Sequence, residues 1–320
     1  MSAVRVLVTG SAGQVGVDLT DTLVGLTPLG GDGQFQPDRE KVQDGEFDVV
    51  GLTRHDLDVT NRDAVFRAFQ AARPDVVVNL AAYTAVDRAE IEVPECYAVN
   101  AIAVESFSQA AREVDAHLIT ISTDYVFDGE KASAYVEDDA MNPLNVYGAS
   151  KRAGELTCTS RDTIVRTSWV MGARGKNVMR LIAARARSGE HVRFVDDQMG
   201  TVTLASDLAR ALVTLVRERP GGVWHVANTG ATTWFELARF AGQSLGRDDH
   251  FATPIATSDL DPAPLAARPP RSDLDTKKWS AQGWLALPAW QRGVDDLPRN
   301  DDRVGTRNTG RSAGGHSLAA

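Results

Sequence analysis

Cysteine is scarce in this 320-residue sequence. Only Cys96 and Cys158 are present, and they stand far apart with no C-x-x-C pair. Cysteines this sparse exclude a disulfide framework and indicate buried free thiols in a reducing compartment. The six histidines show no ligand spacing such as H-E-x-x-H, so a dedicated zinc site is not expected.

The sequence also lacks an excess of positive charge and a long apolar run. Its formal net charge of −9 gives no basic field for a nucleic-acid partner, although a local pocket could still take a phosphorylated ligand. No apolar run reaches about 18 residues, and no charged-then-apolar signal peptide opens the chain. We therefore expect a cytoplasmic protein with no membrane partner.

What is present is a hydrophobic content of 43%, enough for a sizeable core, in a length that fits one large domain or two smaller ones. Continuous apolar runs typical of buried strands lie at residues 4–9, 47–52, 75–80, 117–122 and 163–167. Helix-like segments separate them, at residues 15–23, 60–72, 95–114 and 147–159, and Thr60 is the expected N-cap of the second. This alternation predicts an α/β fold with a Rossmann-type doubly wound parallel sheet.

The first strand runs directly into a glycine turn, Gly10-Ser11-Ala12-Gly13-Gln14-Val15-Gly16. Glycines let the backbone approach a ligand and a helix N-terminus favours negative charge, so strand, turn and helix together are typical of a pyrophosphate cradle. The spacing is G-x-x-G-x-x-G rather than G-x-G-x-x-G, and alone it is a weak signal. Its place after the first strand favours a nucleotide cofactor held at Gly10, Gly13 and Gly16.

The pattern loosens after Trp169. Helices are expected over residues 178–187, 205–217 and 233–245, the last opening with a capping box from Thr233 to Glu236, and a short strand over 223–226. We predict a mainly NAD(P)-binding domain over 1–168 and a smaller, mainly substrate-binding part over 169–298 with some return to the first domain. Residues 29–44 are expected to form a polar loop, and residues 299–320 a disordered tail.

Two further stretches, STDYVF at 122–127 and YGASK at 147–151, indicate chemistry. A helix would place Tyr147 and Lys151 on one face, with Cβ atoms about 6 Å apart. A nearby ammonium favours the phenolate, lowers the phenol pKa and makes the tyrosine a usable proton donor. Thr123, at the end of an apolar run, would supply a hydroxyl to the same substrate oxygen. Alone, Tyr-x-x-x-Lys occurs often by chance on a solvated helix face.

Several blocks occur in order along the chain, namely GSAGQVG (10–16), LDVTN (57–61), RPDVVVNLAAYTAVDRAE (73–90), STDYVFDG (122–129), PLNVYGASKRAGE (143–155), RTSWV (166–170) and RPPRSDLDT (268–276). With them the sequence resembles the extended short-chain dehydrogenases/reductases, and within these the dTDP-4-dehydrorhamnose reductase family. The resemblance implies reduction of dTDP-4-dehydro-β-L-rhamnose to dTDP-β-L-rhamnose by hydride transfer from NAD(P)H, the last step of dTDP-L-rhamnose biosynthesis.

The same resemblance implies roles for single residues. Tyr147 would protonate the oxygen on carbon 4 of the sugar, Lys151 would lower its pKa and hold the nicotinamide ribose, and Thr123 would hydrogen-bond the reacting oxygen. Implied cofactor contacts are Gln14, Val15, Asp58, Val59, Ala81, Ala82 and Tyr83. Implied substrate contacts are Thr123, Asp124 and Trp169, while Asn100 matches a structural or relay asparagine.

Some residues keep two interpretations. Arg54, just after the second strand where an acidic residue would bind the ribose of NAD, either pairs with the 2′-phosphate of NADPH or is solvated surface. NADPH is therefore the expected cofactor, with NADH as an alternative. Arg268 either reaches a diphosphate or forms a structural ion pair. Asp124 could instead be structural, and Trp169 core. The pair Glu90 and Glu92 is expected to be a charged, solvated loop.

The resemblance leaves further points open. Asp18 falls near a position where some relatives use Mg²⁺ at a dimer contact, so a metal and a homodimer stay open. Other sugar-nucleotide enzymes are a rival class, although a dehydratase would need a carboxylate where Tyr125 stands. A second rival is a non-catalytic NADP-binding subunit, such as the regulatory subunit of methionine adenosyltransferase, which resembles the same family.

Overall fold

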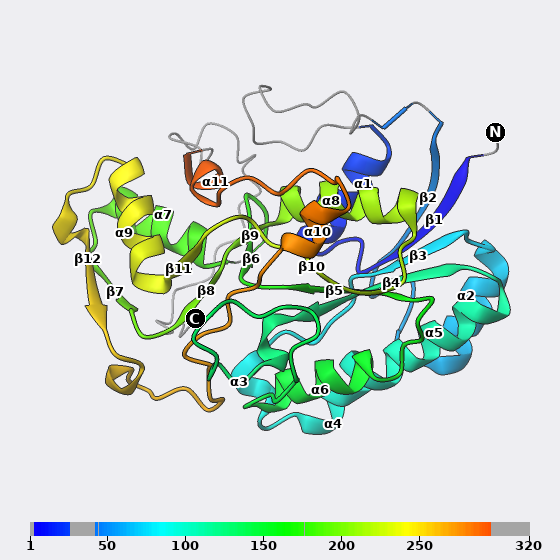
Figure 1. Ribbon diagram of the computed structural model, residues 1–320, viewed down its shortest axis with the longest axis horizontal. Helices are drawn as coiled ribbons and strands as arrows, with labels where there is room; N and C mark the ends of the chain where they lie inside the picture. Colours follow the sequence, from blue (N-terminus) through cyan, green and yellow to red (C-terminus); the bar gives the residue numbers. More distant parts are fainter. Residues whose placement is uncertain (1–2, 26–41, 44, 176, 296–320) are drawn as a thin grey trace, which may run out of the picture.

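A six-stranded parallel sheet forms the centre of the protein (Figure 1). The computed structural model describes residues 3–25, 42–43, 45–175 and 177–295. The strand order is β10 (Gly222–His225), β5 (Thr163–Thr167), β4 (His117–Thr123), β3 (Val76–Asn79), β1 (Val4–Thr9) and β2 (Phe47–Leu52). Every neighbouring pair is parallel. The predicted Rossmann-type doubly wound sheet is confirmed, because its strand order turns back between β1 and β3.

Helices cover both faces of this sheet, as the continuous apolar strands require. On one face lie α1 (Gln14–Leu23) and α8 (Ala205–Glu218), which contact each other and bury Leu19, Leu208 and Leu212 against the strands. On the other face lie α2 (Arg62–Ala72), α5 (Ala103–Glu113) and α6 (Val146–Glu155) (Figure 1). There Phe69 of α2 stacks on Phe107 of α5.

Two helix predictions were wrong in detail. The N-cap of α2 is Asn61, whose side chain accepts from the backbone N–H of Ala64, because the Thr60 hydroxyl instead donates to Asp58. The single helix expected over residues 95–114 is three segments, α4 (Val93–Tyr97), the π-helical turn η1 (Ala98–Ile102) and α5. The wide turn places the Asn100 carbonyl against Gly154 of α6, where an added Cβ would lie only 2.2 Å from the oxygen.

A smaller part with its own core lies at one end of the sheet (Figure 1). It contains α7 (Val178–Ser188), α9 (Trp234–Ser244), α11 (Gln291–Asp295) and three two-stranded pairs, β6 (Val170–Met171) with β9 (Thr203–Leu204), β8 (Met199–Thr201) with β11 (Ala231–Thr233) and β7 (Val192–Val195) with β12 (Ala252–Ile255). The Thr233 side chain accepts from the N–H of Glu236 and caps α9 as predicted. Although late in the chain, α8 and β10 pack with the central sheet.

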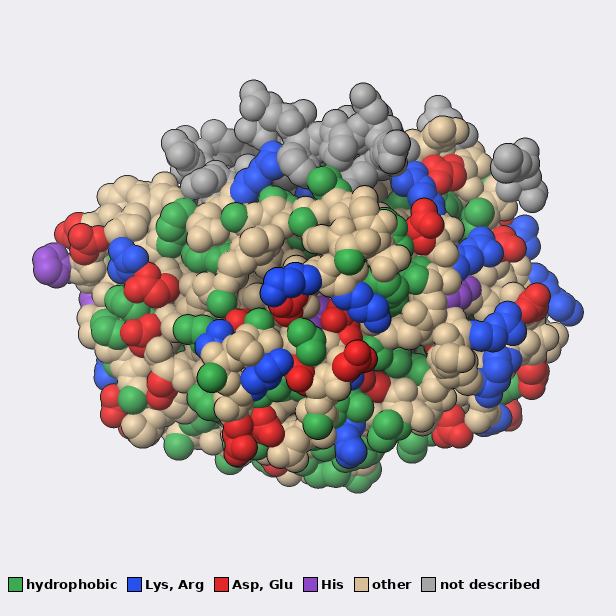
Figure 2. All heavy atoms as spheres, viewed as in Figure 1, with side chains coloured by type: hydrophobic (Ala, Val, Ile, Leu, Met, Phe, Trp, Pro, Cys, Tyr) green, Lys and Arg blue, Asp and Glu red, His purple; other side chains and the backbone are tan. Residues whose placement is uncertain are grey.

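Short elements complete the described chain, namely α3 (Val86–Ala89), α10 (Lys277–Ala281) and the 3-10 turns η2 (Asp124–Val126), η3 (Asp249–Phe251) and η4 (Thr257–Asp259). Apart from residues 42 and 43, the loop predicted over 29–44 lies outside the described residues, as does the tail predicted over 299–320. Within the described ranges, no helix combines the length and apolar character that crossing a bilayer requires. Figure 2 shows acidic and basic side chains interspersed on the face in view.

Candidate active site

One cavity of about 510 Å³ opens where β1, β4 and β5 end, at the carboxyl edge of the sheet. In doubly wound sheets ligands bind at this edge, beside the point where the strand order reverses. Among the residues predicted for the site, those that line it are Gly10, Gly13, Gln14, Val15, Gly16, Ala82, Thr123, Asp124, Tyr147, Lys151 and Trp169. Residues more than 150 positions apart in the chain therefore meet in one place.

The glycine turn is built for close approach. Gly10 has φ +69°, and a Cβ there would lie 2.8 Å from the Leu80 carbonyl carbon at the end of β3. A Cβ on Gly16 would lie 2.2 Å from the Gly10 oxygen. Gly13 is the N-cap of α1 and offers no side-chain acceptor to the first-turn N–H groups. The first-turn residues line the cavity, and N–H groups left without a cap suit the phosphates of a dinucleotide.

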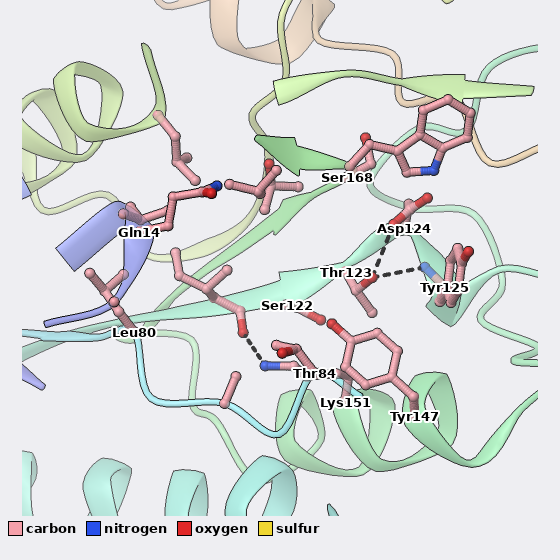
Figure 3. A pocket seen from close by; sticks show the side chains of 18 of the residues that line it. Gln14, Leu80, Thr84, Ser122, Thr123, Asp124, Tyr125, Tyr147, Lys151 and Ser168 are labelled. Carbon is pink, nitrogen blue, oxygen red and sulfur yellow. Dashed lines mark hydrogen bonds between the residues drawn. The ribbon is translucent and has the colours of Figure 1, made fainter. Parts of the chain in front are cut away.

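Tyr147 and Lys151 lie on α6 with their side chains in the cavity (Figure 3). The start of α6 is fixed by Asn145, which accepts from Gly148 N–H at 2.7 Å, and by Glu90, which accepts from Val146 N–H at 2.8 Å. Glu90 is thus part of the scaffold, rather than a solvated loop residue. A Cβ on Gly148 would lie 2.1 Å from the Tyr125 oxygen, so the helix sits directly against η2.

Burial shifts the pKa values of both members of the pair, in opposite directions. Packing around the Tyr147 phenol raises its pKa, and a hydrogen bond with Thr123 opposes that rise. Burial lowers the pKa of Lys151 to about 8. The Lys151 ammonium donates to the Ile121 carbonyl at 3.0 Å (Figure 3). Tyr147 is therefore a protonated phenol at neutral pH.

Thr123 and Asp124 stand at the end of β4, beside the phenol. The Thr123 hydroxyl donates to Asp124 Oδ1 at 3.0 Å and accepts from Tyr125 N–H at 3.2 Å (Figure 3). Ser272, which the sequence did not single out, donates to Asp124 Oδ2 at 2.5 Å. Asp124 is 2% exposed, and burial raises its pKa to about 7. Ser272 lies in the RPPRSDLDT block, and in the sequence only the resemblance of that block to the reductase family pointed to this segment.

An aromatic pair lines the far side of the cavity. The rings of Trp169 and Trp234 stack with centroids 3.8 Å apart and an interplanar angle of 14°. Trp169 has φ +42°, a left-handed conformation that costs a bulky residue energy and is typical of functional sites. The space its ring occupies requires Gly200, where a Cβ would lie 2.7 Å from the indole. Trp234 was missed because α9 lies far along the chain.

A buried ion pair supports the floor of the site. Arg166 of β5 and Glu155 of α6 pair at 2.7 Å with side chains 3% and 4% exposed. Glu155 also accepts from the hydroxyl of Ser122, the residue before Thr123. This pair ties α6, which carries Tyr147, to β4 and β5.

Other predicted residues lie outside the cavity lining. Arg54, Asp58 and Val59 follow β2, where Arg54 and Asp58 are exposed, and Ala81 and Tyr83 stand beside Ala82. Asn100 holds this last segment, since its side chain donates to the Tyr83 carbonyl and accepts from the Tyr83 N–H, both at 2.9 Å. The Tyr83 hydroxyl donates to Glu92, which raises the pKa of Tyr83 to about 12.

Arg268 and Asp18 are occupied by partners within the chain. Arg268 forms a two-pronged ion pair with Asp87, at 2.5 and 2.7 Å, so its structural interpretation is the one observed. Asp18 pairs with Arg174 at 3.3 Å, and burial raises its pKa. The described ranges contain no group of three or more His, Cys, Asp or Glu side chains placed to hold a metal ion.

Known proteins share this fold and these motifs. The family model described as "RmlD substrate binding domain" matches residues 4–301. A dTDP-4-dehydrorhamnose reductase of Streptomyces griseus is 38% identical over 91% of this chain and 92% of its own. A dTDP-4-keto-6-deoxy-D-glucose reductase of Streptomyces niveus is 36% identical over 89% and 93%. The crystal structure of a dTDP-4-dehydrorhamnose reductase from Bacillus anthracis in complex with NADP is 33% identical, with a TM-score of 0.79 over 92% and 98% of the two chains.

Proposed function

The chain belongs to the RmlD family of dTDP-4-dehydrorhamnose reductases, and we propose that it reduces the 4-keto group of dTDP-4-dehydro-β-L-rhamnose with NADPH to give dTDP-β-L-rhamnose. The observation that carries this proposal is the meeting of the glycine turn, the Thr123 hydroxyl and the Tyr147 phenol in one cavity. The first suits a dinucleotide, and the other two suit a carbonyl oxygen that gains negative charge.

The residues present fit the cofactor. A side chain at Gly10 or Gly16 would clash with neighbouring backbone atoms, so the turn presents only backbone to a ligand. The N-terminus of α1 offers N–H groups to a diphosphate. Gly10, Gly13, Gln14, Val15, Gly16 and Ala82 would hold the cofactor, with Lys151 at its ribose. When bound, the reduced nicotinamide supplies the hydride for the carbonyl carbon.

The chain's own side chains act on the oxygen. Tyr147 holds a proton at neutral pH and lines the same cavity as Thr123, so we place both hydroxyls at one substrate oxygen. As negative charge grows there, the two donors stabilise it and the phenol proton moves onto the oxygen. Lys151, 5% exposed and tied to the Ile121 carbonyl, lies one helical turn along α6 and offers positive charge to the resulting phenolate.

The proposed sugar site lies toward Trp169, Trp234 and Asp124. The stacked indoles give a flat apolar wall, and Asp124 gives a polar group in the lining of the same cavity. The dehydratase alternative is disfavoured because the third residue of the motif, Tyr125, has its pKa raised by burial and cannot act as a base at neutral pH.

Arg54 is proposed to favour NADPH over NADH. The positions directly after β2 hold Thr53 and the exposed Arg54, rather than the acidic residue that would repel a 2′-phosphate there. Arg54→Ala should raise KM for NADPH about tenfold and leave KM for NADH unchanged, as expected for loss of an ion pair worth about 1.4 kcal/mol. Equal kinetics with both cofactors in both proteins would remove this assignment.

The function is tested by following NADPH absorbance with purified protein and dTDP-4-dehydro-β-L-rhamnose, then determining the configuration of the product at carbon 4. Net NADPH consumption with dTDP-β-L-rhamnose as product is the expected result. Turnover only with dTDP-4-keto-6-deoxy-D-glucose would move the substrate to that named for the Streptomyces niveus relative. NADPH binding without oxidation would favour the non-catalytic subunit, and conversion without net oxidation would favour a dehydratase or epimerase.

A further inference from the structure

Asp124 is a buried carboxyl that the proposed proton transfer does not use. Its side chain is 2% exposed and has two hydroxyl partners, Thr123 on Oδ1 and Ser272 on Oδ2, while the backbone N–H groups of Asp124 and Tyr125 also favour its ionised form. None of these partners carries charge, although a buried carboxylate is normally paired with a cation. Burial without a cation disfavours the ionised form and raises the pKa of Asp124 to about 7, so both protonation states are populated near neutral pH.

Ser272 is held rigidly in place. Its N–H donates to the Met199 carbonyl at 2.8 Å, and Met199 N–H donates to the Pro270 carbonyl at 2.9 Å, so the segment pairs with β8. The next residue, Asp273, is bound by Arg271 at 2.6 Å, which keeps its carboxylate off the Ser272 hydroxyl. Ser272 itself is 2% exposed. The hydroxyl is therefore aimed at Asp124 by the backbone around it.

The number of hydrogen bonds that Thr123 can make determines whether it can donate one to a substrate oxygen. A hydroxyl has one proton to donate and two lone pairs to accept with. One lone pair already accepts from Tyr125 N–H. When Asp124 is ionised it can only accept, so the single Thr123 proton goes to Oδ1 and none is left for a substrate oxygen. The remaining partner of Thr123 is the Tyr147 phenol, which gives its proton to the ketone in the proposed reaction. A protonated Asp124 can then donate to the second lone pair, and the Thr123 proton is free for the ketone.

We propose that Asp124, fixed by Ser272, is a positioning residue whose protonation state decides whether the Thr123 hydroxyl points its proton at Asp124 or at the reacting oxygen. The proposal rests on the proposed reductase function. No proton leaves Asp124 during turnover, because Tyr147 supplies the one that reaches the product. The neutral form of Asp124 is the active one, since it also adds no negative charge beside the growing oxyanion.

The other titratable groups around this carboxyl are Tyr125, Tyr147 and Lys151, which line the same cavity, and Arg268, which bonds to Tyr125 and pairs with Asp87. Both phenols have raised pKa values and stay neutral through the relevant range. Lys151, with a pKa lowered to about 8, gives a second and more alkaline change. Because the two pKa values lie close together, substitution of Asp124 or Ser272 is needed to tell the Asp124 ionisation from that of Lys151.

The experiment is the pH profile of kcat/KM, from about pH 6 to about pH 9, for wild type, Asp124→Asn, Ser272→Ala and Ser272→Thr. Wild type should lose activity as pH rises through the Asp124 ionisation. Asp124→Asn should lose that step and keep only the alkaline one, since the Asn amide donates permanently to Thr123. Ser272→Ala should move the step about one pH unit higher, because a hydrogen bond to the carboxylate is lost, and Ser272→Thr should restore it. Ser280→Ala, at an exposed position on α10, is the matched control and should leave the profile unchanged.

A second readout needs no turnover. The infrared difference spectrum of wild type minus Asp124→Asn should show the band of a protonated buried carboxyl that titrates with the kinetic midpoint and moves upward in Ser272→Ala. The proposal is overturned if this band is absent at about pH 6, if Asp124→Asn keeps the wild-type step, or if Ser272→Ala leaves the midpoint in place. If wild type does not oxidise NADPH while the band titrates as described, the proposed function fails and the coupling of Asp124 to Ser272 stands.

Discussion

Replacing Tyr147 by phenylalanine removes one oxygen atom from the cavity and should leave nearly everything else in place. The ring keeps its edge contact with Tyr125, so the free energy of unfolding should fall by no more than about 1 kcal/mol. Turnover should fall far more. A preorganised donor to a developing oxyanion contributes about 3 kcal/mol, and the same group supplies the proton, so kcat should drop at least about a hundredfold.

The assay is NADPH oxidation at saturating keto-sugar, with cofactor affinity measured separately by quenching of protein fluorescence. Tyr97→Phe makes the same chemical change on α4, outside the residues that line the cavity, and should keep wild-type kcat. Cofactor affinity of Tyr147→Phe should stay within about threefold of wild type, because the phenol acts on substrate rather than on phosphate. A folded Tyr147→Phe protein that turns over at a rate near wild type would refute the assigned role.

Two further substitutions test the glycine turn and the floor of the site. Gly16→Ala places a Cβ 2.2 Å from the Gly10 oxygen, so the turn must open and the Kd for NADPH should rise by about a hundredfold or more. Gly25→Ala, whose Cβ would meet nothing within 4 Å, should cost some stability because Gly25 has φ +77°, but it should leave that Kd unchanged. Equal affinities of the two variants in a calorimetric titration would contradict the cradle. Arg166→Met leaves Glu155 buried without its partner and should lower the free energy of unfolding by about 3–5 kcal/mol in urea denaturation, whereas Arg161→Met removes an exposed pair with Asp115 and should cost under about 1 kcal/mol. A similar small loss in both variants would mean that the buried pair is not the support inferred here.

The strands of the sheet were predictable because burial on both faces leaves a plain signal. Each consists of a short apolar run, and the ranges 4–9, 47–52 and 163–167 agree with β1, β2 and β5 at both ends. Helix ends were less predictable, since Thr60 and Asn61 are both good caps and only the competing bond from Thr60 to Asp58 decides between them. The π-helical turn at Asn100 depends on contact with Gly154, which no local pattern reveals.

The site was predictable where a motif carries its own geometry. The glycine turn and the Tyr147–Lys151 spacing each lie on one element, and both line the cavity. Trp234 reaches the same cavity, and Ser272 reaches Asp124 beside it, from distant segments of the chain. Their positions depend on how the smaller part docks on the sheet. The raised pKa of Tyr147 could not be foreseen either, because burial is its main cause and the spacing along the helix does not reveal burial.

The convergence of Thr123 and Tyr147 on one oxygen is tested most directly by a double-mutant cycle of Thr123→Val and Tyr147→Phe on kcat/KM. Each single change should cost about a hundredfold, and the double variant should lose far less than the product of the two, because each hydroxyl loses its effect once the other is gone. Losses that multiply, or a Thr123→Val protein with unchanged kcat/KM, would contradict the account.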